Sequence, residues 1–215
     1  MQSYAGVADL YVWGALFLLG CYHGINPGMG WLFAVALGLQ EKSTAAVFRA
    51  VIPIALGHVA SVALVVVLAV FAAQIFPHAI VHRTAAGVLL AFGAYRLMRL
   101  RHPRWVGMRV GFWGLALWGF LMSSAHGAGL MLLPFVTAAY AADSMHMAMP
   151  SPPQAAIIGW AMIAVHTLGY CTSMALVAWI VYQKVGVRFL RQAWVNLDLI
   201  WAGALLVAGI ISLMT

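Results

Sequence analysis

Four long stretches of this sequence contain no charged side chain. Asp, Glu, Lys and Arg are absent between Asp9 and Glu41, between Arg49 and Arg83, between Arg109 and Asp143, and between Asp143 and Lys184. Only 7% of all residues are charged, whereas a typical soluble domain contains roughly 25%. Because about 20 apolar residues in a helix cross the hydrocarbon core of a bilayer, the sequence predicts an all-α integral membrane protein.

The apolar stretches divide into six predicted membrane-spanning helices. They cover residues 9–39, 51–75, 84–100, 110–140, 155–182 and 195–214. The first and the fourth are too long for a straight crossing, so we expect each of them to be tilted or broken. The segment before Asp9 has no basic residues and no small-residue cleavage site, so we expect no cleaved signal peptide.

Lys and Arg are distributed unevenly between the predicted loops. Arg83 is the one basic residue on the side that holds both termini and the second and fourth loops. The first, third and fifth loops contain the other ten, which are Lys42, Arg49, Arg96, Arg99, Arg101, Arg104, Arg109, Lys184, Arg188 and Arg191. Because positively charged loops stay in the cytoplasm, we expect both termini outside and a location in the inner cell membrane. The formal net charge of +7 therefore reflects topology, and we expect no nucleic-acid partner.

The two halves of the chain, residues 1–100 and 101–215, resemble each other in sequence. Residues 86–93 match 202–209, residues 56–64 match 168–176, and His23-Gly24 matches His126-Gly127. A repeat of three spans lies upside down relative to its copy, because three crossings leave the chain on the opposite side. The sequence therefore predicts two inverted three-helix repeats, an organisation typical of transporters whose site lies where the repeats meet at mid-membrane.

Four histidines lie inside predicted spans, one in each of four helices: His23, His58, His126 and His166. Ionisable side chains inside a membrane are costly and mark functional sites, and imidazoles bind Ni, Co, Cu and Zn or relay protons. We expect His23 and His126, which are equivalent in the repeat, to form the core of a metal site. His58 and His166 are further expected ligands, and Tyr170, one turn after His166, should support them from the same helix face.

The segment after His23 should interrupt the first span. Proline lacks an N–H, and the ring of Pro27 clashes with the carbonyl four residues earlier, so we expect a helix break at Pro27 and Gly28. Asn26 and Met29, which flank the break, are candidate ligands beside the histidines.

A second interpretation of the same segment needs no bound ion. Gly20, Gly24 and Gly28 are spaced four residues apart and would form one close-packing helix face. The first span would then be a kinked, tightly packed helix in which His23 is merely hydrogen-bonded.

Other groups in the sequence add weaker predictions. The fourth loop contains Met145, His146, Met147 and Met149, a soft-donor combination that predicts metal capture on the outer face or else a simple flexible loop. Cys21 and Cys171 are expected to be small buried hydrophobes, with a ligand role for Cys21 as the minor alternative. No carboxylate lies at mid-depth, since Asp198 falls in the first turn of the last span, which argues against a site for Mg or Ca.

The motifs of the first two spans resemble those of the nickel/cobalt permease family, which belongs to the lysine-exporter superfamily of small membrane transporters. His23, Pro27 and Gly28 fit one motif of that family, and Leu56-Gly57-His58 fits another. The resemblance implies a three-plus-three fold and transport of a transition metal. Asn26 stands where the family has an acid and Met29 where it has a second histidine, which removes charge compensation for a divalent ion and softens the site toward Cu(I) or Ag(I).

Together these patterns predict a secondary transporter for a small solute, with a transition-metal cation as the expected substrate, and not an enzyme. The chain has no Gly-rich phosphate loop for ATP and should need no cofactor. It would act in the lipid bilayer, either as a single chain, or together with a partner subunit, or as a homo-oligomer. Two alternatives stay open. One is a haem-binding redox subunit, since histidines on neighbouring helices can hold haem, and the other is a non-catalytic membrane subunit.

Overall fold

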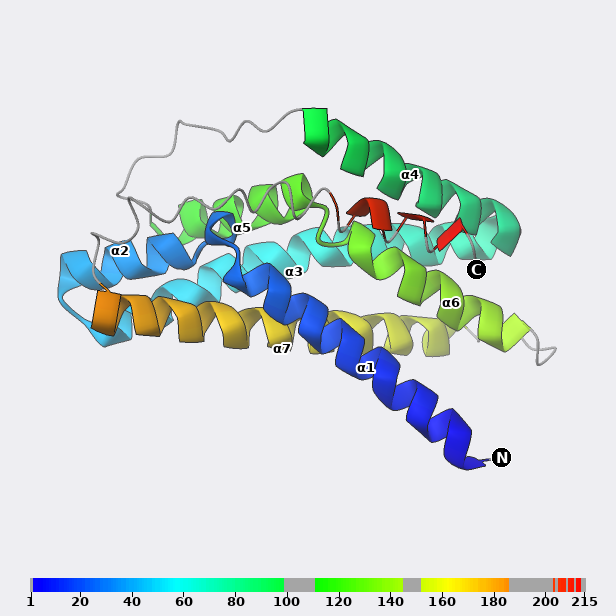
Figure 1. The fold of residues 1–215 in the computed structure, drawn as a ribbon, viewed down its shortest axis with the longest axis horizontal. Helices are drawn as coiled ribbons and strands as arrows, with labels where there is room; N and C mark the ends of the chain where they lie inside the picture. Colours follow the sequence, from blue (N-terminus) through cyan, green and yellow to red (C-terminus); the bar gives the residue numbers. More distant parts are fainter. Residues whose placement is uncertain are drawn as a thin grey trace. The chain divides into compact units, whose positions relative to one another are not determined.

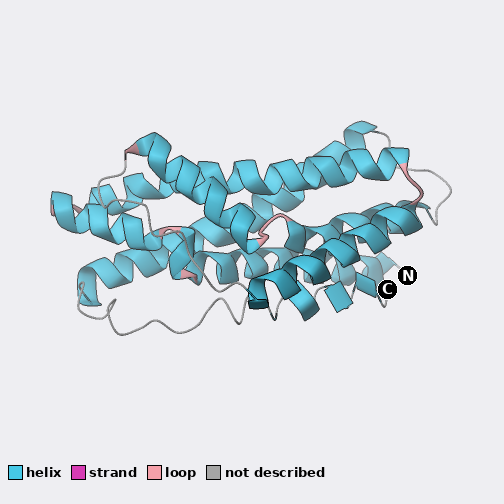
Figure 2. Ribbon diagram, turned by 90° about the horizontal axis from the view of Figure 1, so that it is seen from above, coloured by secondary structure: helices cyan, strands magenta, loops and turns pink. Residues whose placement is uncertain are grey.

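The computed structural model describes residues 2–98, 111–144 and 152–185, together with residues 203, 205–207, 209–210 and 212–213. These ranges are helical and contain no strand (Figure 2). In chain order the elements are α1 (Gln2–Ile25), η1 (Pro27–Met29), α2 (Trp31–Glu41), α3 (Thr44–Ile75), α4 (His78–Met98), α5 (Phe112–His126), η2 (Leu130–Leu132), α6 (Leu133–Ser144), α7 (Pro152–Ile180) and η3 (Val181–Val185) (Figure 1). The predicted all-α class is thus confirmed for the described residues.

Two helices are long and apolar enough to cross a membrane, namely Thr44–Ile75 and Ala156–Lys184. A third candidate is the pair Phe112–His126 and Leu130–Ala138, whose two parts are bent by 52°. By length and composition, the described residues therefore contain two or three of the six predicted spans. Shorter apolar helices, Leu10–Ile25, Trp31–Glu41 and Ala79–Tyr95, occupy the predicted spans 9–39 and 84–100, and most of 195–214 lies outside the described residues.

The second half of α3 exposes a continuous apolar stripe. Leu64, Leu68, Phe71 and Ile75 follow one another at helical spacing, and each is between 51% and 71% exposed. Water disfavours such a stripe, whereas the acyl chains of a bilayer accept it. The stripe is therefore compatible with α3 as a membrane-spanning helix.

The first predicted span is broken at the proline, as predicted. α1 ends at Ile25, and Asn26 is extended with φ −65° and ψ 124°. Its side-chain oxygen accepts a hydrogen bond from the backbone N–H of Gly28 at 2.9 Å, which caps η1. Gly30 then adopts a φ of 122°, a conformation that favours glycine, before α2 begins at Trp31.

The fourth predicted span is broken in the same manner. α5 ends at His126, Gly127 has a φ of 69°, and the short 3₁₀ turn η2 precedes α6. The offset of 103 residues that relates His23 to His126 also relates the bounds of η1 to those of η2. The two breaks thus fall at corresponding positions of the two halves.

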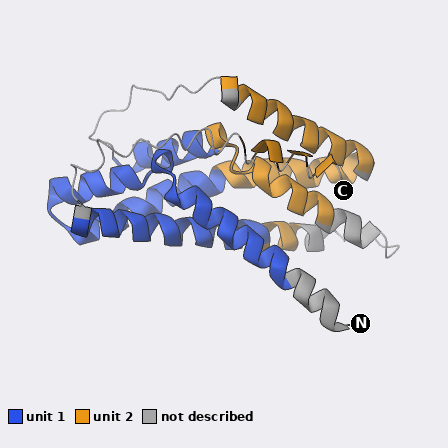
Figure 3. Cartoon of the chain, viewed as in Figure 1, with its two compact units in different colours: residues 1–60, 104–123, 162–195 blue, residues 61–103, 124–161, 196–215 orange. Residues whose placement is uncertain are grey.

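The chain forms two compact units (Figure 3). Unit 1 comprises residues 1–60, 104–123 and 162–195, and unit 2 comprises residues 61–103, 124–161 and 196–215. Each unit takes segments from both predicted repeats. A repeat is a relation between sequences and a unit is defined by contacts, so the division into units does not test the predicted repeats.

Each unit has its own tightly packed interior. In unit 1 the core includes Val35, Ile54, Leu115 and Ala178, all buried. In unit 2 a Cβ atom at Gly129 would lie 2.6 Å from the Cβ of Val65, and His82 Nε2 contacts the backbone carbonyl of Ser212.

Candidate functional site

Glycines bring the backbones of α1 and α7 into direct contact within unit 1. A Cβ atom at Gly20 would lie 1.9 Å from the carbonyl oxygen of His166, and one at Gly24 would lie 2.3 Å from that of Tyr170. From the other side, a Cβ at Gly169 would lie 2.1 Å from the carbonyl oxygen of Phe17. The predicted close-packing face is therefore confirmed at Gly20 and Gly24, and it coexists with the predicted break.

The same kind of contact joins α3 and α5 in unit 1. A Cβ atom at Gly57 would lie 1.9 Å from the carbonyl oxygen of Ala116, and one at Gly119 would lie 2.3 Å from that of Ile54. This approach sets His58, which follows Gly57, against α5. There His58 Nδ1 lies 2.9 Å from the hydroxyl oxygen of Ser123.

Three of the four predicted histidines meet in one cluster. The ring centroids of His23 and His166 are 5.1 Å apart, those of His58 and His166 are 5.4 Å apart, and those of His23 and His58 are 5.8 Å apart. All three residues are 0% exposed. Tyr170 joins them, because its ring stacks on that of His58 at 3.9 Å with an interplanar angle of 7°. We call these four residues the histidine cluster.

Several polar atoms of the histidine cluster have no hydrogen-bond partner among the described residues. They are Nε2 of His58 and both ring nitrogens of His166. The backbone of Leu16 lies near the His166 ring but does not form a hydrogen bond of ordinary geometry with it. Buried polar groups in proteins are nearly always hydrogen-bonded, so these nitrogens mark a place where a ligand would be favourable.

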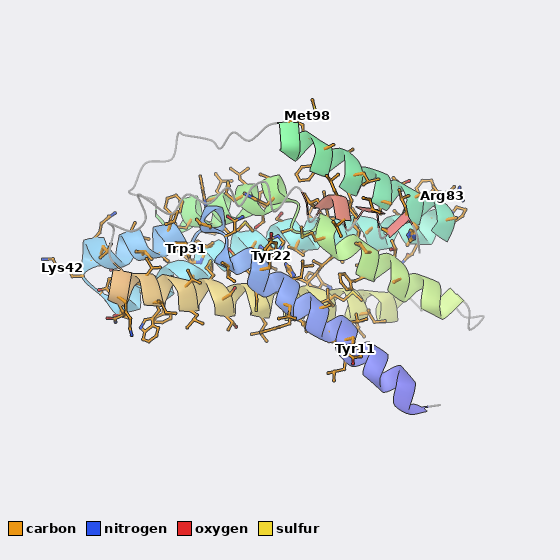
Figure 4. All side chains as sticks on the ribbon, viewed as in Figure 1. Tyr11, Tyr22, Trp31, Lys42, Arg83 and Met98 are labelled. Atoms are coloured by element: carbon orange, nitrogen blue, oxygen red, sulfur yellow. The ribbon has the colours of Figure 1, made fainter. Side chains whose placement is uncertain are left out.

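Aromatic donors bind the backbone carbonyls around the helix break. Three carbonyls that the interrupted helix leaves free each accept a hydrogen bond from an indole N–H or a phenol O–H. The Ile25 carbonyl accepts from Trp31 at 2.9 Å, the Gly28 carbonyl from Trp118 at 3.2 Å and the Met29 carbonyl from Tyr170 at 2.7 Å. Figure 4 labels Trp31 at the start of α2. In this conformation the three carbonyls are therefore engaged by the protein itself.

Tyr170 has two roles in this geometry that a single substitution separates. Tyr170→Phe keeps the ring that stacks on His58 but removes the donor to the Met29 carbonyl. We expect the free energy of unfolding to fall by about 1–2 kcal/mol, because a buried acceptor loses its partner. Thermal unfolding in detergent measures this, with Tyr11→Phe on the exposed part of α1 as the control (Figure 4). Equal unfolding temperatures for the two variants would contradict the assignment.

The remaining predicted ligands have surroundings of their own. His126 is 0% exposed and ends α5; it belongs to unit 2, and its predicted pairing with His23 stays a prediction. Asn26 caps η1 through its oxygen, and Met29 enters the site through its backbone carbonyl, with its side chain in the core of unit 1.

The predicted outer-loop ligands cannot be placed beside the described site, and the two cysteines are described as free thiols. Met145, His146, Met147 and Met149 lie outside the described residues. Cys21 and Cys171 are half-buried free thiols. In the conformation described, no three His, Cys, Asp or Glu side chains of the described ranges are grouped as metal ligands.

Two residues of this region were not predicted from the sequence. Ser123 lies next to the predicted motif around His126, but its pairing with His58 depends on which helices are neighbours. Trp118 lies in the interior of a predicted span, whereas tryptophan in membrane proteins favours the interfaces. That unusual depth is a signal that could have identified it.

Comparison with known proteins adds no family. No protein-family model matches this sequence, and comparisons with curated proteins and with solved structures also give no match. The resemblance to the nickel/cobalt permeases therefore stays a prediction that is carried by the motifs around His23 and His58.

Proposed function

We propose that this chain is a secondary membrane transporter for a transition-metal cation, with the histidine cluster as its binding site. The observation that carries the proposal is the meeting of three fully buried imidazoles, His23, His58 and His166, beside a broken apolar helix. Ionisable residues at such depth are costly, and function is the usual reason for their presence.

The spacing of the rings suits one shared ion. A metal–nitrogen bond of about 2.0–2.1 Å places the centres of three coordinating imidazoles roughly 5 Å apart, close to the observed 5.1–5.8 Å. Binding would require the side chains to rotate so that one nitrogen of each ring points toward a common centre. The unpartnered nitrogens of His58 and His166, noted above for the described residues, are suitable donors.

Contacts within unit 1 support the inverted repeat, residues 1–100 and 101–215, that this proposal includes. Gly57 and Gly169 are equivalent in the sequence match, and each contacts the backbone of a helix from the opposite half. His58 and Tyr170, which follow them, are equivalent as well, and they stack on each other. Two equivalent residues that touch are expected beside a twofold axis. We therefore propose six membrane-spanning helices in two inverted three-helix repeats.

The proposed topology follows the basic residues. The first loop carries Lys42 and the exposed ion pair of Arg49 with Glu41 at 2.7 Å, and Figure 4 shows Lys42 at the end of α2. We place the first, third and fifth loops in the cytoplasm and both termini outside the inner membrane. Transport would proceed by rocking one repeat against the other around the site, without ATP hydrolysis by this chain and without a resident cofactor.

Metal uptake by proteoliposomes tests the proposal. Vesicles with the purified chain are incubated with Ni²⁺, Co²⁺, Zn²⁺, Ag⁺ or reduced copper, and their content is measured by elemental mass spectrometry. We expect saturable uptake of at least one ion, reduced to the level of protein-free vesicles in His23→Ala. His82→Ala, a histidine of unit 2, is the matched control and should retain uptake.

Two results would contradict the proposal. Absence of uptake together with a Soret band in the purified protein would instead support a haem-binding subunit. Absence of uptake without such a band, and with no effect of the histidine substitutions on any property, would support a non-catalytic membrane subunit.

A further inference from the structure

We infer that the cation bound by the histidine cluster is monovalent and soft, of the class of Cu(I) and Ag(I), and that thioethers of α7 help to bind it. This inference rests on the proposed function and narrows it to one class of substrate. It depends on two observations, the charge of the site and the donors that surround it.

The first observation is that the one carboxylate side chain whose surroundings the structure describes, that of Glu41, is exposed and not part of the histidine cluster. The sequence contains four carboxylate side chains, those of Asp9, Glu41, Asp143 and Asp198. Glu41 is exposed and paired with Arg49, and Asp9 and Asp143 lie near the outer ends of predicted spans. Asp198, outside the described residues, is predicted at the beginning of a span and not at its middle.

A site without a carboxylate, as this placement predicts, favours a cation with a single positive charge. Neutral imidazoles bind a cation without compensating it, so the ion keeps its full charge in a medium of low dielectric constant. The free energy of desolvation rises with the square of the charge. The desolvation cost of a divalent ion is therefore about four times that of a monovalent ion of the same size.

The second observation is a row of donors along α7. Every fourth residue from Met162 to Met174 carries a sulfur, nitrogen or oxygen atom, in the order Met162, His166, Tyr170 and Met174. Residues at this spacing share one helix face, and each of the four is at most 4% exposed. Two of them, His166 and Tyr170, are members of the histidine cluster.

Further thioethers from other elements lie in the same hydrophobic core as Tyr170. Met29 carries the carbonyl that Tyr170 binds, and Met122 precedes Ser123, the neighbour of His58. Both side chains pack in the same core as Tyr170 and Met174. Thioethers are soft, neutral ligands that select Cu(I), whereas carboxylates and water suit hard ions. The donor set and the charge therefore select the same class of ion.

Direct metal binding tests this inference. The full chain with Cys21→Ala and Cys171→Ala, which removes thiols that would capture silver, is purified in detergent. It is incubated separately with Ag⁺, Zn²⁺, Ni²⁺ and Co²⁺, desalted and analysed by elemental mass spectrometry. We expect the protein to retain silver and His166→Ala to lose it. The affinity for each of the three divalent ions should be about 100-fold or more weaker than the affinity for silver.

Substitution of single methionines tests the thioether ligands. Met174→Leu keeps the volume and removes the sulfur, and it should lower the silver affinity about tenfold. Met162→Leu, on the other side of His166, provides a second test if Met174→Leu does not fold. Met131→Leu, a buried methionine of unit 2, is the matched control and should bind silver normally.

The outcomes separate this inference from the proposed function. Tighter binding of a divalent ion than of silver, lost in His166→Ala, would overturn the inference and leave the proposed transporter intact. Unchanged silver affinity in both methionine variants would overturn the thioether ligands. Retention of no metal, combined with no uptake in proteoliposomes, would overturn both proposals.

Discussion

Replacing His166 by leucine should make the folded chain more stable and abolish its transport activity. His166 is fully buried, and neither ring nitrogen has a hydrogen-bond partner within the described residues. Leucine of similar volume removes two buried polar groups that cost free energy, so we expect a gain of about 1–2 kcal/mol. The same change removes a ligand of the proposed site, and uptake should fall about 100-fold or more, equivalent to roughly 2.8 kcal/mol. Thermal unfolding and proteoliposome uptake measure the two effects.

The opposite signs of these effects distinguish a binding residue from a structural one. His82→Leu makes the same exchange at a histidine that contacts Ser212. It should destabilise the chain, because it leaves the hydroxyl of Ser212 without that partner, and it should preserve uptake. If His166→Leu instead destabilised the protein strongly, His166 would be a packing residue and the binding site would need different donors.

Gly57→Ala should cause a large loss of stability in unit 1. The added Cβ would lie 1.9 Å from the carbonyl oxygen of Ala116 and 2.6 Å from the backbone nitrogen of Phe120. Backbone atoms of a helix cannot turn away as a side chain can, so α3 and α5 would have to separate. Overpacking of a core costs about 1–3 kcal/mol, and we expect a loss at or above the upper end. Denaturant titration in detergent and the folded fraction in size-exclusion chromatography measure it.

Two other glycines provide matched controls for this substitution. A Cβ atom at Gly14 or at Gly87 would meet no atom of the described chain within 4 Å. Alanine is a better helix former than glycine. The free energy of unfolding of both variants should therefore lie within about 0.5 kcal/mol of the value for the unmodified protein, or exceed that value. A similar loss in all three variants would show that the close contact of α3 with α5 is not what makes Gly57 necessary.

The features that the sequence predicted correctly depend on local chemistry. The break follows from the missing N–H of Pro27 and its clash with the preceding turn, both properties of one segment. The common face of His166 and Tyr170 follows from their spacing of four residues. Close packing at Gly20 and Gly24 follows from the absence of side chains at that spacing. None of these predictions requires knowledge of which helix lies alongside.

The features that the sequence did not predict depend on which helices are neighbours. Periodicity shows which face of a helix is special, but it does not identify the helix packed against that face. Repeat symmetry predicts His126 as the partner of His23, and this pairing stays a prediction because His126 belongs to unit 2. Within unit 1 the structure groups His23 with His58 and His166, which symmetry alone does not indicate. The contacts of Ser123 with His58 and of Trp118 with the Gly28 carbonyl were inaccessible for the same reason.

The number of spans illustrates a different difficulty. A run without charges gives the length of an apolar segment and not the length of the helix within it. The run that begins after Asp9 contains two helices, because η1 and Gly30 separate them. By length and composition the described residues therefore contain two or three spanning helices where the sequence predicts six.

In the proposed membrane-spanning arrangement, the aromatic donors at the helix break have a consequence for how the membrane stays sealed. In a soluble protein, water solvates the free carbonyls at a helix end, and in a bilayer that water would have to penetrate to the depth of the break. Here Trp31, Trp118 and Tyr170 solvate three such carbonyls from within the protein. These three carbonyls need no water, so in the proposed arrangement they would not draw in a chain of hydrogen-bonded water along which protons could leak.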